Sequence, residues 1–150
     1  MSQVLLIAAD HPLPLCDRQH ERTETFSVSG KTCSVTAVSG FRVGELSYYR
    51  DAVELLGHEM KPYRYELETE DCAEDLAALR SYLAQHFTCG EEVELWNLWV
   101  GSDDSDRPGC YRGTFSDFDE EAFSQFLSPP HRRGGIGQCR MTITFETNIT

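Results

Sequence analysis

The sequence predicts an α+β fold: a two-layer sandwich in which a mixed, mostly antiparallel sheet of about six strands carries three helices on one face. Several segments alternate apolar and polar residues with the period of a strand, and three others repeat apolar residues at helical spacing. The segment 91–101 becomes apolar on both faces in its second half, as a buried central strand does. The 150 residues suit a single domain, 1–150.

The first element is an apolar strand over residues 4–9, and an extended loop follows it. Two prolines, Pro12 and Pro14, exclude a helix there, and the loop continues to His20. The segment 1–9 has neither a basic region nor a small-residue cleavage site, so it does not read as a signal peptide. We therefore expect a cytoplasmic protein whose six cysteines are reduced.

A hairpin of strands 24–29 and 32–38 comes next and contributes two strands to the predicted sheet. The turn Gly30-Lys31 has glycine in its first position, which suits a type II′ turn. The register set by this turn brings apolar side chains together on one face, Val28 with Cys33 and Phe26 with Val35. Cys33 is accordingly predicted to be a small core residue.

Two helices and a strand make up the middle of the chain. Apolar spacing predicts helices over about 45–56 and 72–87, and Asp71 with Glu74 forms a variant of the capping box before the second. A strand over 63–68 lies between them, and the strand 91–101 follows the second helix. Strand, helix and strand form a β-α-β unit, which predicts that its two strands are parallel.

A polar loop, a short helix and a last strand complete the chain. Residues 102–114 are predicted to form the loop. The short helix that follows contains the apolar residues within 118–127, and Ser116 or Asp117 is its predicted N-cap. The strand 138–147 alternates cleanly, with inward side chains at Cys139, Met141, Ile143 and Phe145.

The net charge of −12 is concentrated in one stretch of the chain. Residues 66–127 hold sixteen acids and three arginines, a net charge of −13. Such a field repels nucleic acid and anionic membranes and attracts basic proteins. No apolar run approaches the length of a membrane-spanning helix. We expect neither a nucleic-acid nor a membrane partner.

One loop offers candidate metal ligands: His11, Cys16 and His20. Three nitrogen or sulfur ligands with an open fourth position are what a catalytic zinc requires, and Cys16 could alternatively be a nucleophile with a histidine base. No standard zinc module has this spacing. An ordinary polar loop with solvated histidines explains the same residues.

Two further sets could bind a ligand. Arg132 and Arg133 lie in a glycine-rich loop whose amides and guanidinium groups could hold a phosphate or carboxylate. A set of aromatic residues could line a cleft or an interface, although their spacing on strands and helices also suits core positions: Trp96, Trp99, Tyr48, Tyr49, Tyr63 and Tyr65. Rows of carboxylates, Glu66, Glu68, Glu92 and Glu94, could pair as acid and base for sugar cleavage, or be an exposed polar face.

The sequence contains no motif specific enough to name a reaction or a cofactor. It favours a small acidic protein-binding module without catalysis, which docks a basic partner through the 66–127 half. The alternative is a small enzyme or ligand-binding domain that uses the His11/Cys16/His20 loop, with or without a metal. Homodimerisation through an edge strand or an open sheet face is compatible with either function.

Overall fold

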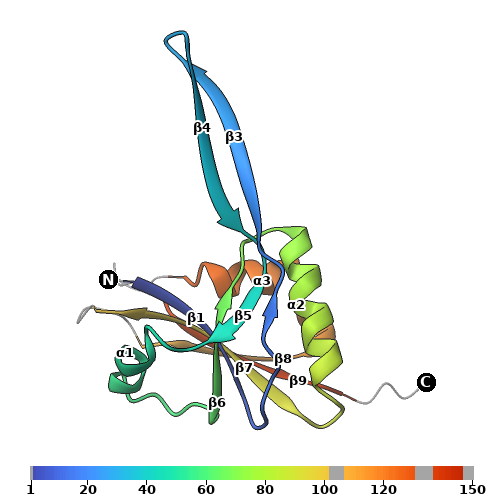
Figure 1. The fold of residues 1–150 in the computed structure, drawn as a ribbon. Coiled ribbons are helices and arrows are strands. Elements are labelled where there is room, and N and C mark those ends of the chain that lie inside the picture. The colour runs from blue at the N-terminus through green and yellow to red at the C-terminus, as the bar shows by residue number, and fades with distance from the viewer. Residues whose placement is uncertain (1, 102–106, 131–136, 147–150) are drawn as a thin grey trace.

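The computed structural model describes residues 2–101, 107–130 and 137–146. It confirms the α+β class: a seven-stranded mixed sheet, a separate two-stranded sheet and three α-helices (Figure 1). The elements are β1 Ser2–Ala9, β2 Cys16–Asp17, β3 His20–Val28, β4 Lys31–Ser39, β5 Arg42–Glu45, α1 Arg50–Leu55, β6 Tyr63–Glu68, α2 Ala73–His86, β7 Glu92–Val100, β8 Gly109–Thr114, the 3-10 turn η1 Phe115–Asp117, α3 Glu120–Leu127 and β9 Cys139–Thr144. No helix among the described residues is long and apolar enough to cross a membrane.

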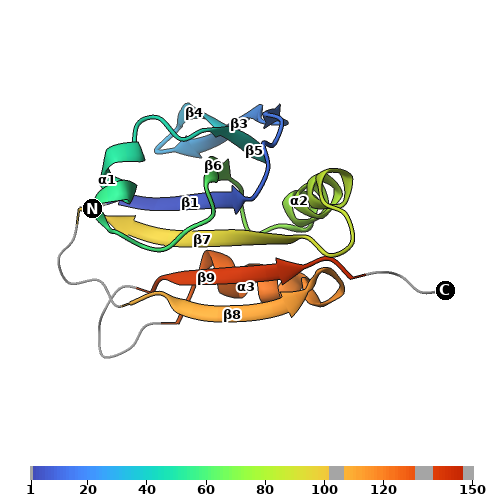
Figure 2. The same cartoon turned by 90° about the horizontal axis from the view of Figure 1, so that it is seen from below.

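The large sheet has the strand order β2-β5-β6-β1-β7-β9-β8, with β1 in the middle. Every neighbouring pair is antiparallel except β8 with β9. Because β6 and β7 both run antiparallel to β1, they are parallel to each other, as predicted. They are not neighbours, however, since β1 lies between them (Figure 2).

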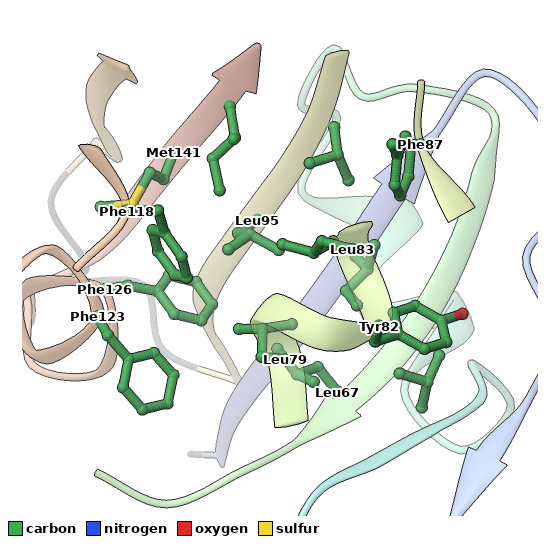
Figure 3. Close-up of a cluster of buried hydrophobic side chains, with 14 of the residues drawn as sticks. Leu67, Leu79, Tyr82, Leu83, Phe87, Leu95, Phe118, Phe123, Phe126 and Met141 are labelled. Carbon is green, nitrogen blue, oxygen red and sulfur yellow. The ribbon is translucent and has the colours of Figure 1, made fainter. Parts of the chain in front are cut away.

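The main core lies between the sheet and the helices α2 and α3. Leu79 and Leu83 of α2 meet Ile7 and Leu95 of the central strands, and all four side chains have no exposed surface. Phenylalanines of α3 and of the segment before it complete the layer (Figure 3). Truncating one of these leucines to alanine would lower the free energy of unfolding by about 2–5 kcal/mol.

The opposite face of the sheet is covered by α1, so the prediction that all three helices share one face is wrong. Val4 and Leu6 of β1 and Leu98 of β7 pack there against Val53 of α1. The cause is visible in the sequence, because strands that are apolar on both faces need a cover on both sides. One short helix, α1, covers this face, and the parts of the face on either side of it are polar.

Several predicted boundaries also change. The helix expected over 45–56 begins only at Arg50, because the residues of β5 pair with β6 instead. The N-cap of α2 is Cys72, with no side-chain capping bond. Asp119, and neither Ser116 nor Asp117, caps α3 by accepting from Ala122 N at 3.0 Å. The segment read as a polar loop contains β8 at the edge of the sheet.

The strands β3 and β4 form a hairpin that projects away from the rest of the molecule, and we call it the arm (Figure 1). Its placement in the main sheet was predicted wrongly. Its turn is Ser29-Gly30, where both residues have positive φ, as in a type I′ turn, and not Gly30-Lys31. Phe26 therefore pairs with Cys33, which is only partly buried. The register differs by two residues, so each side chain keeps its predicted face.

The arm continues an edge hairpin of the main sheet in the same register. Cys16 of β2 pairs with Val43 of β5, and Arg18 N donates to Phe41 O at 2.9 Å. His20 then pairs with Ser39 at the base of the arm. Gly40 lies at this junction with φ +125°, and a Cβ on it would come within 2.9 Å of the Arg18 carbonyl oxygen. Only glycine fits there without displacing backbone.

Candidate functional site

The three predicted metal ligands lie in different surroundings. His11 Nε2 approaches Glu91 Oε2 at 2.8 Å, and its ring packs on Phe87. Cys16 belongs to β2, and His20 begins the arm. In the described part of the chain, no group of three or more His, Cys, Asp and Glu side chains is placed to hold a metal ion. The arrangement gives the metal hypothesis no support.

The predicted ligand-binding residues do not form one site in the described structure. Trp96 is only 3% exposed and is held by its neighbours: its indole N–H donates to Glu94 Oε1 at 3.3 Å, and His58 stacks on it at 5.7 Å. Trp99 lies on the other face of β7 and is partly exposed. Arg132 and Arg133 lie outside the described residues.

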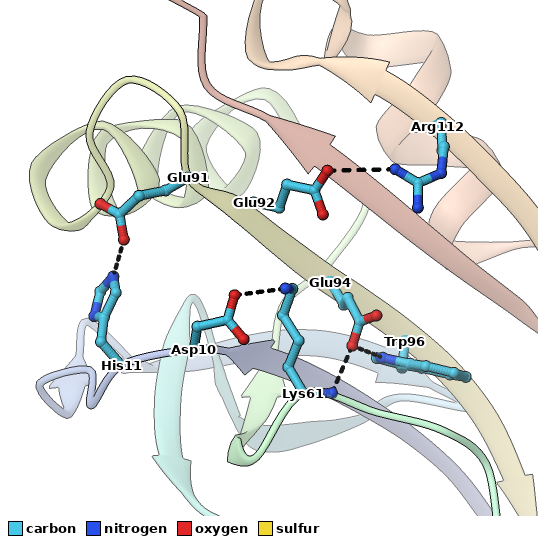
Figure 4. Close-up of polar contacts among 8 residues, drawn as sticks. All are labelled: Asp10, His11, Lys61, Glu91, Glu92, Glu94, Trp96 and Arg112. Carbon is cyan, nitrogen blue, oxygen red and sulfur yellow. Dashed lines mark hydrogen bonds and ion pairs between the residues drawn. The ribbon is translucent and has the colours of Figure 1, made fainter.

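A network of polar contacts around Glu94 has a structural explanation (Figure 4). Glu94 is buried, and its Oε1 also accepts from the backbone N–H of Lys61 at 2.8 Å. The Lys61 ammonium group in turn pairs with Asp10 at 2.6 Å. These bonds fasten the segment before β6 to β7 and to the end of β1. They satisfy the buried carboxylate, as burial demands.

The predicted rows of carboxylates do not lie on neighbouring strands. Glu66 and Glu68 belong to β6 and Glu92 and Glu94 to β7, with β1 between the two strands. Glu94 is engaged as described above, and Glu92 approaches Arg112 at 3.4 Å. The hypothesis of acid–base pairing between the two rows therefore loses its premise.

Two clefts that share Glu66 open beside the base of the arm, and we call them together the Glu66 groove. One, of about 590 Å³, is bounded by β2, β5 and the segment that leads to α1. The other, of about 360 Å³, is bounded by the base of the arm and the end of β6. Segments far apart in the sequence meet here because β5 and β6 are neighbouring strands.

The Glu66 groove is strongly acidic. Its charged residues are one base, Arg42, and five acids, Asp17, Glu45, Glu66, Glu68 and Glu70. The base is already engaged, because Arg42 Nη2 donates to Glu68 Oε1 at 2.7 Å. That bond lowers the pKa of Glu68, which also accepts from Gln19 at 2.6 Å. Glu68 therefore stays ionised.

Glu66 differs from Glu68 in having no such partner. It forms no hydrogen bond or ion pair with any residue that the structure describes. Burial raises its pKa and the charge of Glu68 adds to this effect, whereas the charge of Arg42 partly opposes it. A partly desolvated carboxylate beside a second, ionised carboxylate is a position that favours an incoming cation.

Aromatic residues border the groove. Tyr48 is 86% exposed, and its ring meets that of Tyr49 edge to face with centroids 4.8 Å apart. Exposed tyrosine rings can bind a cation or an aliphatic stem. Sequence reasoning names Tyr48 and Tyr49 among possible cleft residues, but it misses the acidic groove because it places both tyrosines within a predicted helix. The alternation in Arg42-Val43-Gly44-Glu45 was the signal for a strand there.

The arm carries a second uncovered surface. Phe26, Val28 and Val35 are 46%, 54% and 52% exposed, although they are large and apolar. They share one face of the hairpin. An exposed apolar row on a projecting element is typical of an interaction surface.

Comparison with known proteins finds no matching family model, no matching curated protein and no matching solved structure.

Proposed function

We propose that this chain is a small protein-binding module that receives a basic segment of a partner protein in the Glu66 groove. The observation that carries the proposal is Glu66 itself: a partly buried carboxylate that forms no direct ion pair with a described residue, because the nearby Arg42 is bonded to the ionised Glu68. Arg42 is one positive charge shared by two carboxylates, and a lysine or arginine side chain from a partner supplies a second. Catalysis plays no part in this proposal.

The charges of the groove support a basic partner over an acidic or neutral one. A cation placed about 4 Å from Glu66 gains roughly 4 kcal/mol of gross Coulomb energy at an effective dielectric constant of about 20. Desolvation of the cation offsets much of this gain. Tyr48 adds an exposed ring on the rim of the groove. We expect several weak contacts, of which the contact with Glu66 contributes most.

The proposal refines the sequence-based expectation of an acidic docking half. Glu66, Glu68 and Glu70 open the acid-rich stretch 66–127, whereas Asp17 and Glu45 come from outside it. The binding surface is therefore assembled by the fold and is not the stretch as a whole. Binding should weaken with salt, because much of the groove is accessible to solvent.

The test is a titration of the isotope-labelled protein with a basic decapeptide that alternates arginine and alanine, followed by NMR at 20 mM and 500 mM salt. We expect shifts of amide signals in β5 and β6 at low salt and loss of binding at high salt. Glu66→Gln keeps the shape of the side chain and removes its charge, and it should weaken binding about tenfold.

A matched control is Glu121→Gln, which removes a charge from the exposed first turn of α3, away from the groove. This variant should bind the peptide with an affinity within about twofold of the wild-type value, as expected for a distant exposed charge. Equal loss in both variants would mean that the peptide responds only to the net charge of the protein. That result, or the absence of binding at low salt, would refute the proposal.

A further inference from the structure

Most apolar residues of the arm lie on one of its two faces, and Val38, which pairs with Glu21, is the one large apolar residue on the other. The cross-strand pairs on this face, from tip to base, are Val28 with Lys31, Phe26 with Cys33, Glu24 with Val35, Arg22 with Ala37 and His20 with Ser39. The other face carries mostly threonine and serine, and Thr23 Oγ1 lies 3.2 Å from Thr36 Oγ1. Alternation along the two strands thus separates an apolar face from a hydroxyl face.

Nothing in the described part of the chain covers the apolar face. The strands β3 and β4 pack on each other, and no described helix or other strand packs extensively on them. Their side chains are exposed along the whole arm, apart from partial burial of Cys33 and Ser39. A two-stranded hairpin alone is marginally stable in water, so a cover on its apolar face would stabilise it.

Two charges flank the centre of this face symmetrically. Lys31 lies one pair nearer the tip than the Phe26–Cys33 pair, and Glu24 lies one pair nearer the base. Neither takes part in an ion pair with a described residue. A twofold axis through Phe26, running across the strands, would exchange these positions. Lys31 of each copy would then lie opposite Val35 of the other and diagonal to its Glu24, within reach of the long lysine side chain, and Val28 would lie diagonal to Val35.

We propose that the apolar face of the arm binds the same face of a second copy of this chain. The two arms pack antiparallel and face to face around Phe26, and two Lys31–Glu24 ion pairs fix the register. Successive pairs on one face are about 7 Å apart. The turn of each arm therefore lies opposite the segment between Glu24 and Arg22 of the other copy, short of its base, so the two bodies do not collide.

The size of this contact predicts a weak dimer. The arms overlap over a length of about 20 Å, and each arm is only two strands wide. The area that each copy buries is therefore smaller than the roughly 800 Å² per partner of a standard interface. We expect a reversible dimer with a dissociation constant of roughly micromolar order. The same charge argument predicts that the dimer weakens as salt is raised.

The test is sedimentation velocity of the full chain alone over a range of concentrations. Lys31→Glu and Glu24→Lys should each raise the dissociation constant about tenfold, because each variant brings like charges together twice. Mixing the two variants restores opposite charges in a heterodimer, so the mixture should associate about as well as the wild type. The variant that carries both substitutions, E24K and K31E, should also associate about as well as the wild type.

Glu21→Lys is the matched control, since Glu21 is exposed on the hydroxyl face of the same strand. It should leave association unchanged within about twofold. A wild-type chain that stays monomeric at the highest soluble concentration would overturn the proposal. So would two charge-reversed variants that fail to associate when mixed. No peptide is present in this measurement, so its outcome is independent of binding in the Glu66 groove.

Discussion

Single residues on this sheet show how similar side chains acquire different roles. Glu94 and Glu66 are both glutamates on strands of the same sheet. Glu94 is buried and accepts hydrogen bonds from Lys61 N and the Trp96 indole, so its negative charge is used within the fold. Glu66 is partly buried without such donors, so its charge remains available to a ligand.

The two glutamates of β6 should affect stability in opposite directions. Burial raises the pKa of Glu66 in the folded protein, so folding disfavours its ionised form. The stability of the protein therefore falls as the pH rises through the pKa that Glu66 has in the folded state. The bond from Arg42 lowers the pKa of Glu68 in the folded protein. Glu68 therefore stabilises the fold at pH values above its pKa in the unfolded chain, and this stabilisation is lost as the pH falls through its pKa in the folded protein.

We therefore expect Glu66→Gln to raise the midpoint of thermal unfolding at pH 7, and Glu68→Gln to lower it. Both differences from the wild type should shrink as the pH is lowered through the range in which these carboxylates titrate. Differential scanning calorimetry from pH 7 to about pH 3.5 measures this, since the unperturbed glutamate pKa lies near 4.3. Shifts of the same sign at pH 7 would contradict the assignment of the Arg42 bond.

At the scale of elements, the arm and the central strands differ most. The strands β1 and β7 are buried on both faces and paired on both edges, whereas the arm is a lone hairpin with exposed faces. Local opening of the arm needs no disruption of either core, so its opening free energy should be far below that of global unfolding.

Amide hydrogen exchange should show this difference directly. At protein concentrations where the chain is monomeric, we expect amides of β3 and β4 to exchange at least about a hundredfold faster than those of β1 and β7. Ser29→Asn should slow exchange in the arm, because asparagine tolerates the positive φ of that position better than serine. Arm protection equal to that of β7 in the monomer would show that something in the chain covers the arm.

The elements that the sequence predicted correctly are those with a clear local period. The segments β6, α2 and β9 have alternating or helical patterns over six residues or more, and the structure confirms them. The edge strand β8 reads Gly-Cys-Tyr-Arg-Gly-Thr, which carries no apolar alternation and looks like a loop. Its pairing with β9 is decided by tertiary structure.

The candidate surfaces were harder to predict than the strands. The Glu66 groove joins Asp17, Arg42 and Glu66, which no local pattern brings together. The faces of the arm were predicted correctly, since they depend only on alternation. That these faces would be solvent-exposed was not predictable, because a hairpin pattern does not state whether another layer packs on it.

For the molecule as a whole, the arm should be dispensable for folding. Arg18 and Phe41 are already hydrogen-bonded where the arm leaves the body. Replacing residues 20–39 by Asn-Gly therefore closes the chain with a short turn. We expect the midpoint of thermal unfolding to change by less than about 3 °C, since neither core includes an arm residue.

Leu79→Ala provides the contrast, because Leu79 is fully buried beneath the sheet. It should lower the midpoint by about 5–15 °C, which corresponds to the loss of about 2–5 kcal/mol in a domain of this size. An arm-less variant that fails to fold would show that the hairpin belongs to the folding unit.

The unbroken register from β2 and β5 into the arm has a mechanical consequence. The strands cross the Gly40 junction without a linker, so the direction of the arm is set by the twist of the sheet edge. Nine extended residues span about 30 Å, and a rotation of roughly 10° at the junction would swing the tip by about 5 Å. A slight rotation beside the Glu66 groove would therefore be amplified along the arm and would be largest at its tip.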